Sequence, residues 1–167
     1  MTLDEFNRLD DDAAGRALAG CCAASRWVDD MLARRPFGDR QALFDAARAA
    51  WAGTGERDRL EAFEAHPKIG DIDSLRARYA STRDMAAGEQ GGVAGADAAT
   101  LAELAGLNEA YHERFGFIFI VFASGKSAGE MLALIRSRIN NSREQELANA
   151  SAEQIEITLL RLGRLVS

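Results

Sequence analysis

The sequence has few prolines, histidines and cysteines, and little basic charge. Its 167 residues include two of each of these types, and 26 acidic residues outnumber 20 basic ones. The formal net charge of −6 and a pI near 5.0 argue against nucleic acid as the main partner, because phosphate binding needs a basic surface. An anionic small molecule remains a possible ligand, since it responds to the local field alone.

Disulfides, a secretion signal and a membrane span are also missing. Cys21 and Cys22 are adjacent, so they form neither a disulfide framework nor a metal-ligand spacing. The longest apolar run, Phe115–Ala123, is too short to cross a bilayer. The first residues, Met1–Glu5, lack the basic start and apolar stretch of a signal peptide. We therefore expect a cytoplasmic protein with no membrane partner and with both thiols buried on a helix.

What the sequence does contain is helix-forming and apolar. With 47% hydrophobic and 28% charged residues, residues 1–167 can form a single domain with a real core. Apolar residues recur every three or four positions, which predicts an all-α fold, a compact bundle of about eight or nine helices. We expect helices at residues 3–9, 10–24, 25–36, 39–53, 56–65, 73–79, 97–115, 127–140 and 142–167.

The segment 117–123 is an exception to this helical pattern. Its β-branched and aromatic residues favour a strand, but a lone strand would have no partner in a helical chain. We interpret it as a buried extended segment. Its backbone N–H and C=O groups then need hydrogen-bond partners, and a ligand could be one of them.

Two motifs with a possible chemical meaning fail on inspection. Gly125-Lys126-Ser127 looks like the end of a phosphate-binding loop, but that pattern requires a glycine where Ile120 stands. His66 and His112 could share a metal ion, but neither has a cysteine or carboxylate at ligand spacing. We therefore predict no metal site.

His66 stands directly before Pro67, at the end of a helical stretch. A residue before proline is pushed out of the helical region, so His66 should project away from its helix. An imidazole that titrates near neutral pH can then donate or accept a proton. The alternative is a histidine that ends a helix and bonds to its last carbonyl groups.

Three further polar residues are candidates for the same site. Glu89 could orient His66, and Gln90 could bind a polar edge of a ligand, or both could be solvated loop residues. Arg161 lies among leucines, which favours partial burial and a carboxylate or bidentate partner, although it could also be a surface residue.

Taken together, these motifs resemble one family in order and spacing. The family is 2-oxo-4-hydroxy-4-carboxy-5-ureidoimidazoline (OHCU) decarboxylase, and the resemblance extends from Phe6 to the C-terminus. The motifs are His66-Pro67-x-Ile69-Gly70, Glu89-Gln90, Asn108-Glu109-x-Tyr111-x-x-Arg114-Phe115-Gly116-Phe117-x-Phe119, Arg138-x-Asn140 and Leu160-Arg161-Leu162.

The resemblance implies an all-helical, cofactor-independent enzyme, expected to be a homodimer. Its reaction is the decarboxylation of OHCU to S-allantoin, the third step from urate. The implied catalytic residues are His66 and Glu89. The implied substrate-binding residues are Pro67, Gln90, Arg161 and the backbone of Phe119, Ile120 and Val121.

Two positions depart from the family pattern. Ala86 stands where many members have serine, so one polar contact to substrate is missing or is supplied by water, Ser81 or Thr82. Ile118 replaces a proline of animal relatives, which we expect to be neutral. Ala86 leaves open a non-catalytic, ureide-binding or scaffold protein with a degenerate pocket. A related lyase or hydrolase would need a metal or an activated nucleophile that the sequence does not offer.

Overall fold

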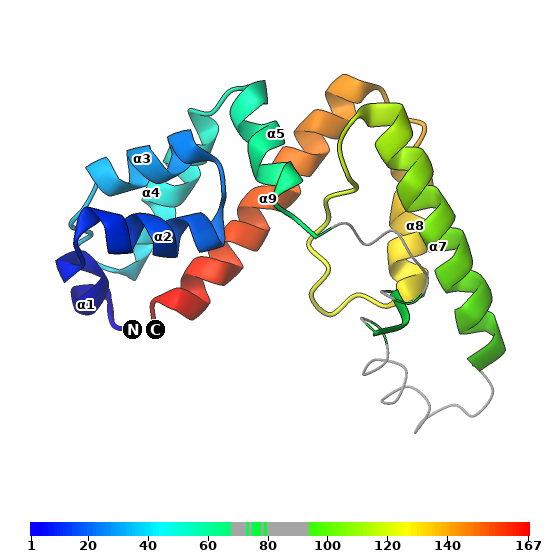
Figure 1. Cartoon of the computed structure of the whole chain (residues 1–167), viewed down its shortest axis with the longest axis horizontal. Helices are drawn as coiled ribbons and strands as arrows, with labels where there is room; N and C mark the ends of the chain where they lie inside the picture. Colours follow the sequence, from blue (N-terminus) through cyan, green and yellow to red (C-terminus); the bar gives the residue numbers. More distant parts are fainter. Residues whose placement is uncertain (68–72, 74, 78, 80–93) are drawn as a thin grey trace. The chain divides into compact units, whose positions relative to one another are not determined.

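The computed structural model describes residues 1–67, 73, 75–77, 79 and 94–167. Within these ranges every regular element is a helix, which confirms the predicted all-α class (Figure 1). The chain forms two compact units. The first unit comprises Met1–His66 and Leu147–Ser167, and the second comprises Pro67–Glu146. None of the described helices is long and apolar enough to cross a membrane.

Of the helices that the structure describes over their full length, five lie wholly in the first unit, two belong to the second, and one begins in the second unit and continues in the first. The first five are α1 (Leu3–Arg8), α2 (Asp11–Cys21), α3 (Ser25–Ala33), α4 (Arg40–Ala52) and α5 (Glu56–Glu64). The others are α7 (Ala94–Phe115), α8 (Ala128–Arg138) and the shared helix α9 (Arg143–Leu165).

Short polar side chains fix where the helices of the first unit begin. Thr2 and Glu5 form the predicted capping box of α1. Asp10 accepts a hydrogen bond from the backbone of Ala13 at 2.6 Å, and Asp39 does the same for Ala42 at 2.7 Å. These acceptors satisfy N–H groups that have no partner inside the helix, so the chain enters each helix at a defined residue.

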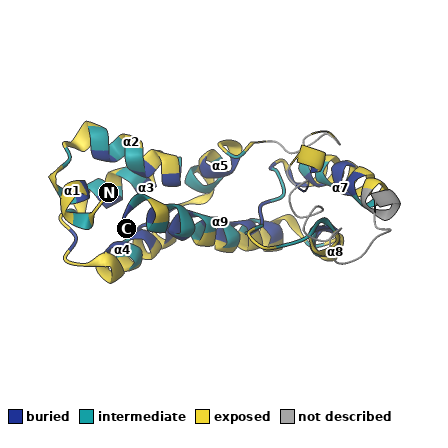
Figure 2. Ribbon diagram, turned by 90° about the horizontal axis from the view of Figure 1, so that it is seen from below, coloured by how far each residue is buried: buried dark blue, intermediate teal, exposed yellow. Residues whose placement is uncertain are grey.

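The core of the first unit is built around α3, which packs on α2, α4 and α5. Trp27 is fully buried, and its indole N–H donates to the Ala47 carbonyl at 3.1 Å. The Trp51 indole donates to the Ser151 carbonyl of α9 at 2.9 Å. Figure 2 shows the buried faces of these helices in dark blue. Both tryptophans therefore fill the core without leaving a polar atom unpaired.

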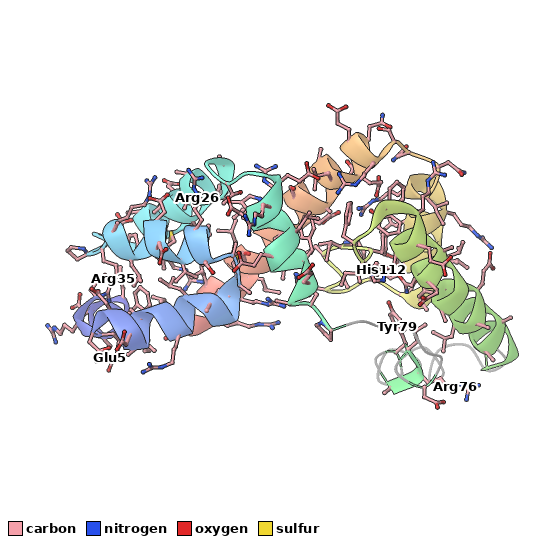
Figure 3. All side chains as sticks on the ribbon, turned by 45° about the horizontal axis from the view of Figure 1, so that its top comes forward. Glu5, Arg26, Arg35, Arg76, Tyr79 and His112 are labelled. Atoms are coloured by element: carbon pink, nitrogen blue, oxygen red, sulfur yellow. The ribbon has the colours of Figure 1, made fainter. Side chains whose placement is uncertain are left out.

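The ends of the chain are tied into the first unit. The Met1 amino group donates to the Leu165 carbonyl at 3.0 Å, and the Ser167 N–H donates to the Met1 carbonyl at 3.0 Å (Figure 1). Arg35, labelled in Figure 3, donates to the Phe6 carbonyl. That carbonyl lies in the last turn of α1, where the helix itself offers few donors.

In the second unit α7 packs on α8 around a cluster of aromatic rings. The Tyr111 ring lies 4.5 Å from Phe115, 6.0 Å from Phe117 and 5.3 Å from Phe119, measured between ring centroids. These tilted and edge-on contacts are favourable for aromatic pairs. They hold the start of the segment 117–123 against α7.

The segment 117–123 is neither helix nor strand, as the sequence analysis expected. Gly116 precedes it with a φ of 79°, a conformation that glycine adopts without strain. Phe117, Ile120 and Val121 are buried, and the residues between them are half-buried.

Some predicted boundaries were wrong. Helix α2 ends at Cys21 instead of Ala24, because Cys22 already has an extended backbone. Ser25 was expected to cap α3, but Ala24 holds the cap position. The Ser25 hydroxyl instead donates to Glu61 of α5 at 2.5 Å.

Candidate active site

His66 lies directly after α5, where the helix stops. Its backbone N–H still donates to the Phe63 carbonyl at 3.2 Å, and the exposed Pro67 follows, which has no N–H to continue the ladder. The half-buried imidazole does not bond to the last carbonyls of α5. Its Nε2 lies 2.5 Å from Oε1 of Gln154 on α9. The side chain is therefore held by a partner far along the sequence, as a functional group would need to be.

The surroundings of His66 favour its neutral form. Burial lowers the pKa of the imidazole below its usual 6.5, the Gln154 hydrogen bond opposes this by raising it, and the positive charge of Arg161 lowers it further. The structure therefore brings His66 and Arg161 close enough to interact, as the sequence analysis anticipated.

Arg161 is half-buried, in agreement with the leucines around it. Its Nη1 donates to the Cys21 carbonyl at the end of α2, at 3.3 Å. A guanidinium has five N–H donors in a planar fork, so this one bond orients it and leaves most of its donor capacity for a ligand.

The segment 117–123 is held in the second unit by a buried polar cluster. Arg138 donates through Nη1 to the Ile120 carbonyl at 2.9 Å, and through Nε to Glu146 at 2.7 Å. Tyr111 donates its hydroxyl to the same carboxylate at 2.6 Å. The Arg138 guanidinium also lies over the Phe119 ring, 4.6 Å from its centroid.

This cluster gives one carbonyl group of the segment a hydrogen-bond donor, but it gives the backbone N–H groups of the segment no acceptor. Among the described residues, no acceptor is found for the backbone N–H groups of Phe119, Ile120 and Val121. Backbone donors that are fixed in position can stabilise an oxygen that gains negative charge.

Two predicted site residues, Glu89 and Gln90, lie outside the described residues, as does Ala86. Their proposed roles stay predictions. The described part of the chain holds no group of three or more histidine, cysteine or acidic side chains that could bind a metal ion.

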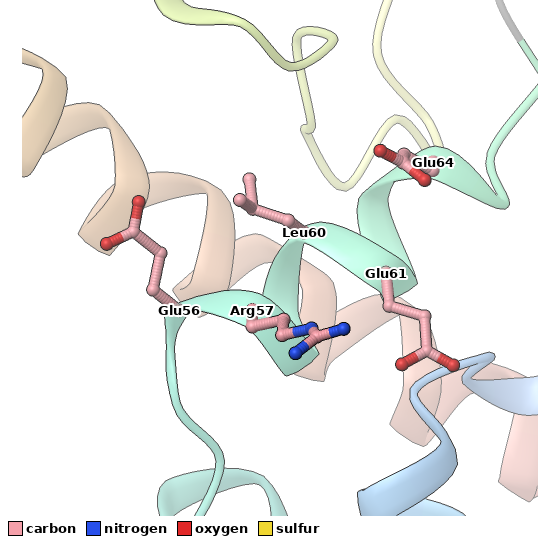
Figure 4. A pocket seen from close by; sticks show the side chains of 5 residues that line it. All are labelled: Glu56, Arg57, Leu60, Glu61 and Glu64. Atoms are coloured by element: carbon pink, nitrogen blue, oxygen red, sulfur yellow. The ribbon is translucent and has the colours of Figure 1, made fainter.

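One surface depression of about 650 Å³ is lined by residues of α5 alone (Figure 4). Three of the lining side chains are carboxylates, from Glu56, Glu61 and Glu64, against the single cation of Arg57. None of the predicted site residues belongs to it. Its charge suits an anionic substrate poorly, so we do not assign the substrate to this depression.

Both cysteines are buried, as predicted, although the helix includes only one of them. Cys21 is the last residue of α2, Cys22 follows it, and the positive charge of Arg161 acts on both thiols. Burial outweighs that charge. Burial raises the pKa of Cys21 to about 11, and it also raises the pKa of Cys22. Thiols that stay protonated are poor nucleophiles.

Sequence reasoning missed Gln154 and gave no role to Arg138 or Glu146. A signal for Gln154 was present in the sequence. Ser151, Gln154, Thr158 and Arg161 follow each other by three, four and three residues, which places them on one face of α9. Ser151, Gln154 and Thr158 are all buried, so a polar stripe runs along a core-facing side of this helix.

Comparison with known proteins identifies the family of the chain. The family model described as OHCU decarboxylase matches residues 7–163. The chain is 35% identical to the uric acid degradation bifunctional protein TTL of Arabidopsis thaliana over 88% of its own length, and spans 45% of that protein. It is 29% identical to the 2-oxo-4-hydroxy-4-carboxy-5-ureidoimidazoline decarboxylase of Haloferax volcanii, covering 100% of this chain and 97% of that one.

A solved structure shows the same fold. A crystal structure of OHCU decarboxylase in the presence of (S)-allantoin matches with a TM-score of 0.71 and 34% identity, over 94% of this chain and 98% of the other. The chain therefore belongs to the OHCU decarboxylase family.

Proposed function

We propose that this protein decarboxylates OHCU to S-allantoin, the third step of urate degradation. The observation that carries the proposal is His66, held by Gln154 beside Arg161, in a chain that matches the family over residues 7–163. The archaeal relative named for this activity and the crystal structure with (S)-allantoin support the same substrate and product.

The reaction needs charge stabilisation and a positioned proton. When the C–CO₂⁻ bond breaks, its electron pair stays on the ring carbon and delocalises into the carbonyl system of the ring. The 4-hydroxyl loses its proton to become a carbonyl group, and a proton must reach one face of the adjacent ring carbon, which carries the ureido group and is the chiral centre of the product. Because the ring accepts the electrons, we predict that no cofactor is required.

His66 handles the proton in this mechanism. Its lowered pKa means that the neutral imidazole predominates at neutral pH, so it can accept a proton from the 4-hydroxyl of the substrate and return one to carbon. Pro67 sets its position, and Glu89 is proposed as its carboxylate partner.

Cationic and amide donors are proposed to bind the substrate. Arg161 offers its remaining guanidinium donors to a carboxylate or carbonyl edge, and Gln90 to a polar edge. The backbone amides of Phe119–Val121 are proposed as the wall that stabilises the oxygen that gains charge. We further propose that residues 1–167 act as one domain, in a cytoplasmic homodimer, as the family resemblance implies.

The test is enantiomer-selective turnover. Urate oxidase and hydroxyisourate hydrolase generate OHCU in a cuvette, this protein is added, and circular dichroism follows S-allantoin. We expect a rapid signal that falls by roughly 10²–10⁴-fold in His66→Asn, because that is the typical contribution of one acid or base. The matched control is His112→Asn, on α7, which should keep normal turnover (Figure 3).

Two results would contradict the proposal. Growth of the signal no faster than spontaneous decay would favour the non-catalytic binding protein instead. Near-normal turnover in His66→Asn would remove His66 from the mechanism while leaving the activity in place.

A further inference from the structure

A chain of buried hydrogen bonds leads from α9 to His66. It starts at Thr158, which is 1% exposed and whose hydroxyl donates to the Gln154 carbonyl one turn earlier, at 2.9 Å. A hydroxyl has a single proton, so with this bond made Thr158 can only accept from its other neighbours.

The Gln154 amide is such a neighbour. Its Nε2 lies 3.2 Å from the Thr158 hydroxyl. Because the Thr158 proton is already used, the hydroxyl oxygen accepts from this amide.

This arrangement decides which end of the Gln154 amide faces His66. Its NH₂ group must point to Thr158, because a carbonyl oxygen there would face an atom with no proton to give. Oε1 therefore lies against His66 Nε2, at 2.5 Å. An acceptor at that distance requires a proton on Nε2.

We propose that Gln154 is a positioning residue that fixes neutral His66 as its Nε2–H tautomer, so that Nδ1 exchanges the proton with the substrate. This assignment of the reacting atom rests on the proposed function. The tautomer itself rests on geometry in the first unit alone.

A neutral partner also fits the electrostatics of the site. When His66 takes up a proton, both ring nitrogens become donors, and Oε1 of Gln154 remains a good acceptor. Gln154 adds no charge, and the charged group that faces His66 among the described residues is Arg161. A carboxylate in place of Gln154 would favour the imidazolium and raise the pKa of His66.

The tautomer can be measured without substrate. The chain has two histidines, so ¹⁵N-histidine NMR gives two ring systems, and His112→Asn identifies the signals of His66. At a pH above the His66 transition, we expect Nε2 to show the protonated shift and Nδ1 the unprotonated one. In Gln154→Leu the two shifts should move toward each other as both tautomers become populated.

Two variants that keep shape make the test independent of folding. Thr158→Val removes the hydroxyl, frees the Gln154 amide to turn, and should also mix the tautomers. Gln154→Glu should move the His66 titration to higher pH. The control is Glu156→Gln, on an exposed position of the same helix, which should change neither property.

Kinetics then assign the reacting atom. Gln154→Leu should lower kcat by on the order of 10²-fold, as misplacement of a reacting group does, with a smaller effect on KM. In Gln154→Glu the acid limb of the pH–kcat/KM profile should move to higher pH with the NMR titration. A purely structural role would lower activity without moving that limb.

Failure of this inference is distinct from failure of the proposed function. An Nδ1–H tautomer in the unaltered protein, or tautomers unchanged in Gln154→Leu, overturns the role of Gln154 whatever the activity. Absence of decarboxylation alongside the expected spectra overturns the function and, with it, the assignment of Nδ1 as the reacting atom.

Discussion

Arg138 and Glu146 form the most deeply buried ion pair of the described residues. The side chains are 9% and 0% exposed, with Nε and Oε1 2.7 Å apart. The carboxylate also accepts from Tyr111 and from the Asn141 amide, at 2.9 Å. Both oxygens of the buried carboxylate therefore have a donor, which is the condition under which a buried pair is tolerated.

We expect Arg138→Met to lower the free energy of unfolding by about 3–5 kcal/mol, because it leaves a buried carboxylate without its cation. The matched control is Arg136→Met on the same helix. Arg136 pairs with Glu103 at the surface, where the side chains are 55% and 45% exposed, so its loss should cost at most about 1 kcal/mol. Urea unfolding measures both. Equal effects would show that burial does not govern the pair.

The lowered pKa of His66 makes a prediction about acid stability. Burial, the first cause of the shift, disfavours the imidazolium in the folded chain, whereas the unfolded chain takes up the proton near pH 6.5. The unfolded state therefore binds more protons below that pH. We expect the free energy of unfolding to decrease as the pH falls from 6.5 to the pKa of His66 in the folded chain. Below that pKa, His66 should cause no further change.

Urea unfolding of the wild type and His66→Asn across this pH range tests the point. The variant should show a shallower loss, since it lacks the titrating group. An identical decline in both would mean that other groups govern the acid side.

The sequence identified His66 and Arg161 because their immediate neighbours restrict them. Pro67 forces the histidine out of its helix, and flanking leucines pull the arginine inward. For Gln154 the spacing of polar residues along α9 indicates only a helix face, because its contacts with His66 and Thr158 form only in the folded chain. Partners of this kind cannot be found from propensities alone.

At the scale of helices, ends were predicted well where a side chain caps its own helix. The helices capped by Thr2, Asp10, Asp39 and Ser127 all begin within one residue of the predicted position. Ser25 was misassigned because Glu61, distant in sequence, competes for its hydroxyl. A tertiary contact overrode the local preference.

Two glycines, one inside α7 and one directly after it, should respond in opposite ways to alanine. Gly106 lies inside the helix, and a Cβ there would meet nothing within 4 Å, so Gly106→Ala should stabilise by about 0.5–1 kcal/mol. Gly116 follows the helix with a φ of 79°, so Gly116→Ala should destabilise by about 1–2 kcal/mol.

Thermal unfolding compares the two variants. A shift of roughly 2–4 °C per kcal/mol is expected for a chain of this size, upward for Gly106→Ala and downward for Gly116→Ala. A lower melting temperature in Gly106→Ala would show that a larger side chain at this position meets an obstacle that the structure does not contain.

At the scale of the whole molecule, the class and the helix order followed from periodicity, but the two units did not. Helix α9 reads as one amphipathic element, and nothing in its sequence marks Leu147 as the residue where one unit gives way to the other. That division depends on which distant residues α9 contacts. Glu146 accepts a hydrogen bond from Tyr111 of the second unit, and the Ser151 carbonyl accepts one from Trp51 of the first.

Each unit contains a buried acidic group that is neutral at ordinary pH. In the first unit, burial raises the pKa of Cys21 from 9.0 to about 11. In the second, burial and then the hydrogen bond to Glu146 raise the pKa of Tyr111 above its usual 10. Both groups are held in their protonated forms by the fold.

The folded protein should therefore lose stability in alkali. Above about pH 9 the unfolded chain releases the Cys21 proton while the folded chain keeps it, so the unfolded state binds fewer protons and stability falls as the pH rises. For Cys21 the loss amounts to roughly 2–3 kcal/mol by the time the pH passes about 11, at about 1.4 kcal/mol for each pKa unit.

Urea unfolding at about pH 8 and about pH 10.5 measures this decline, and Cys21→Ala should make it smaller by removing one of the groups whose pKa the fold raises. Tyr111 continues to titrate in that variant, so part of the decline must remain. A decline of the same size with and without Cys21 would mean that its thiol ionises as readily in the folded chain as in the unfolded one. Burial at the end of α2 would then not protect it.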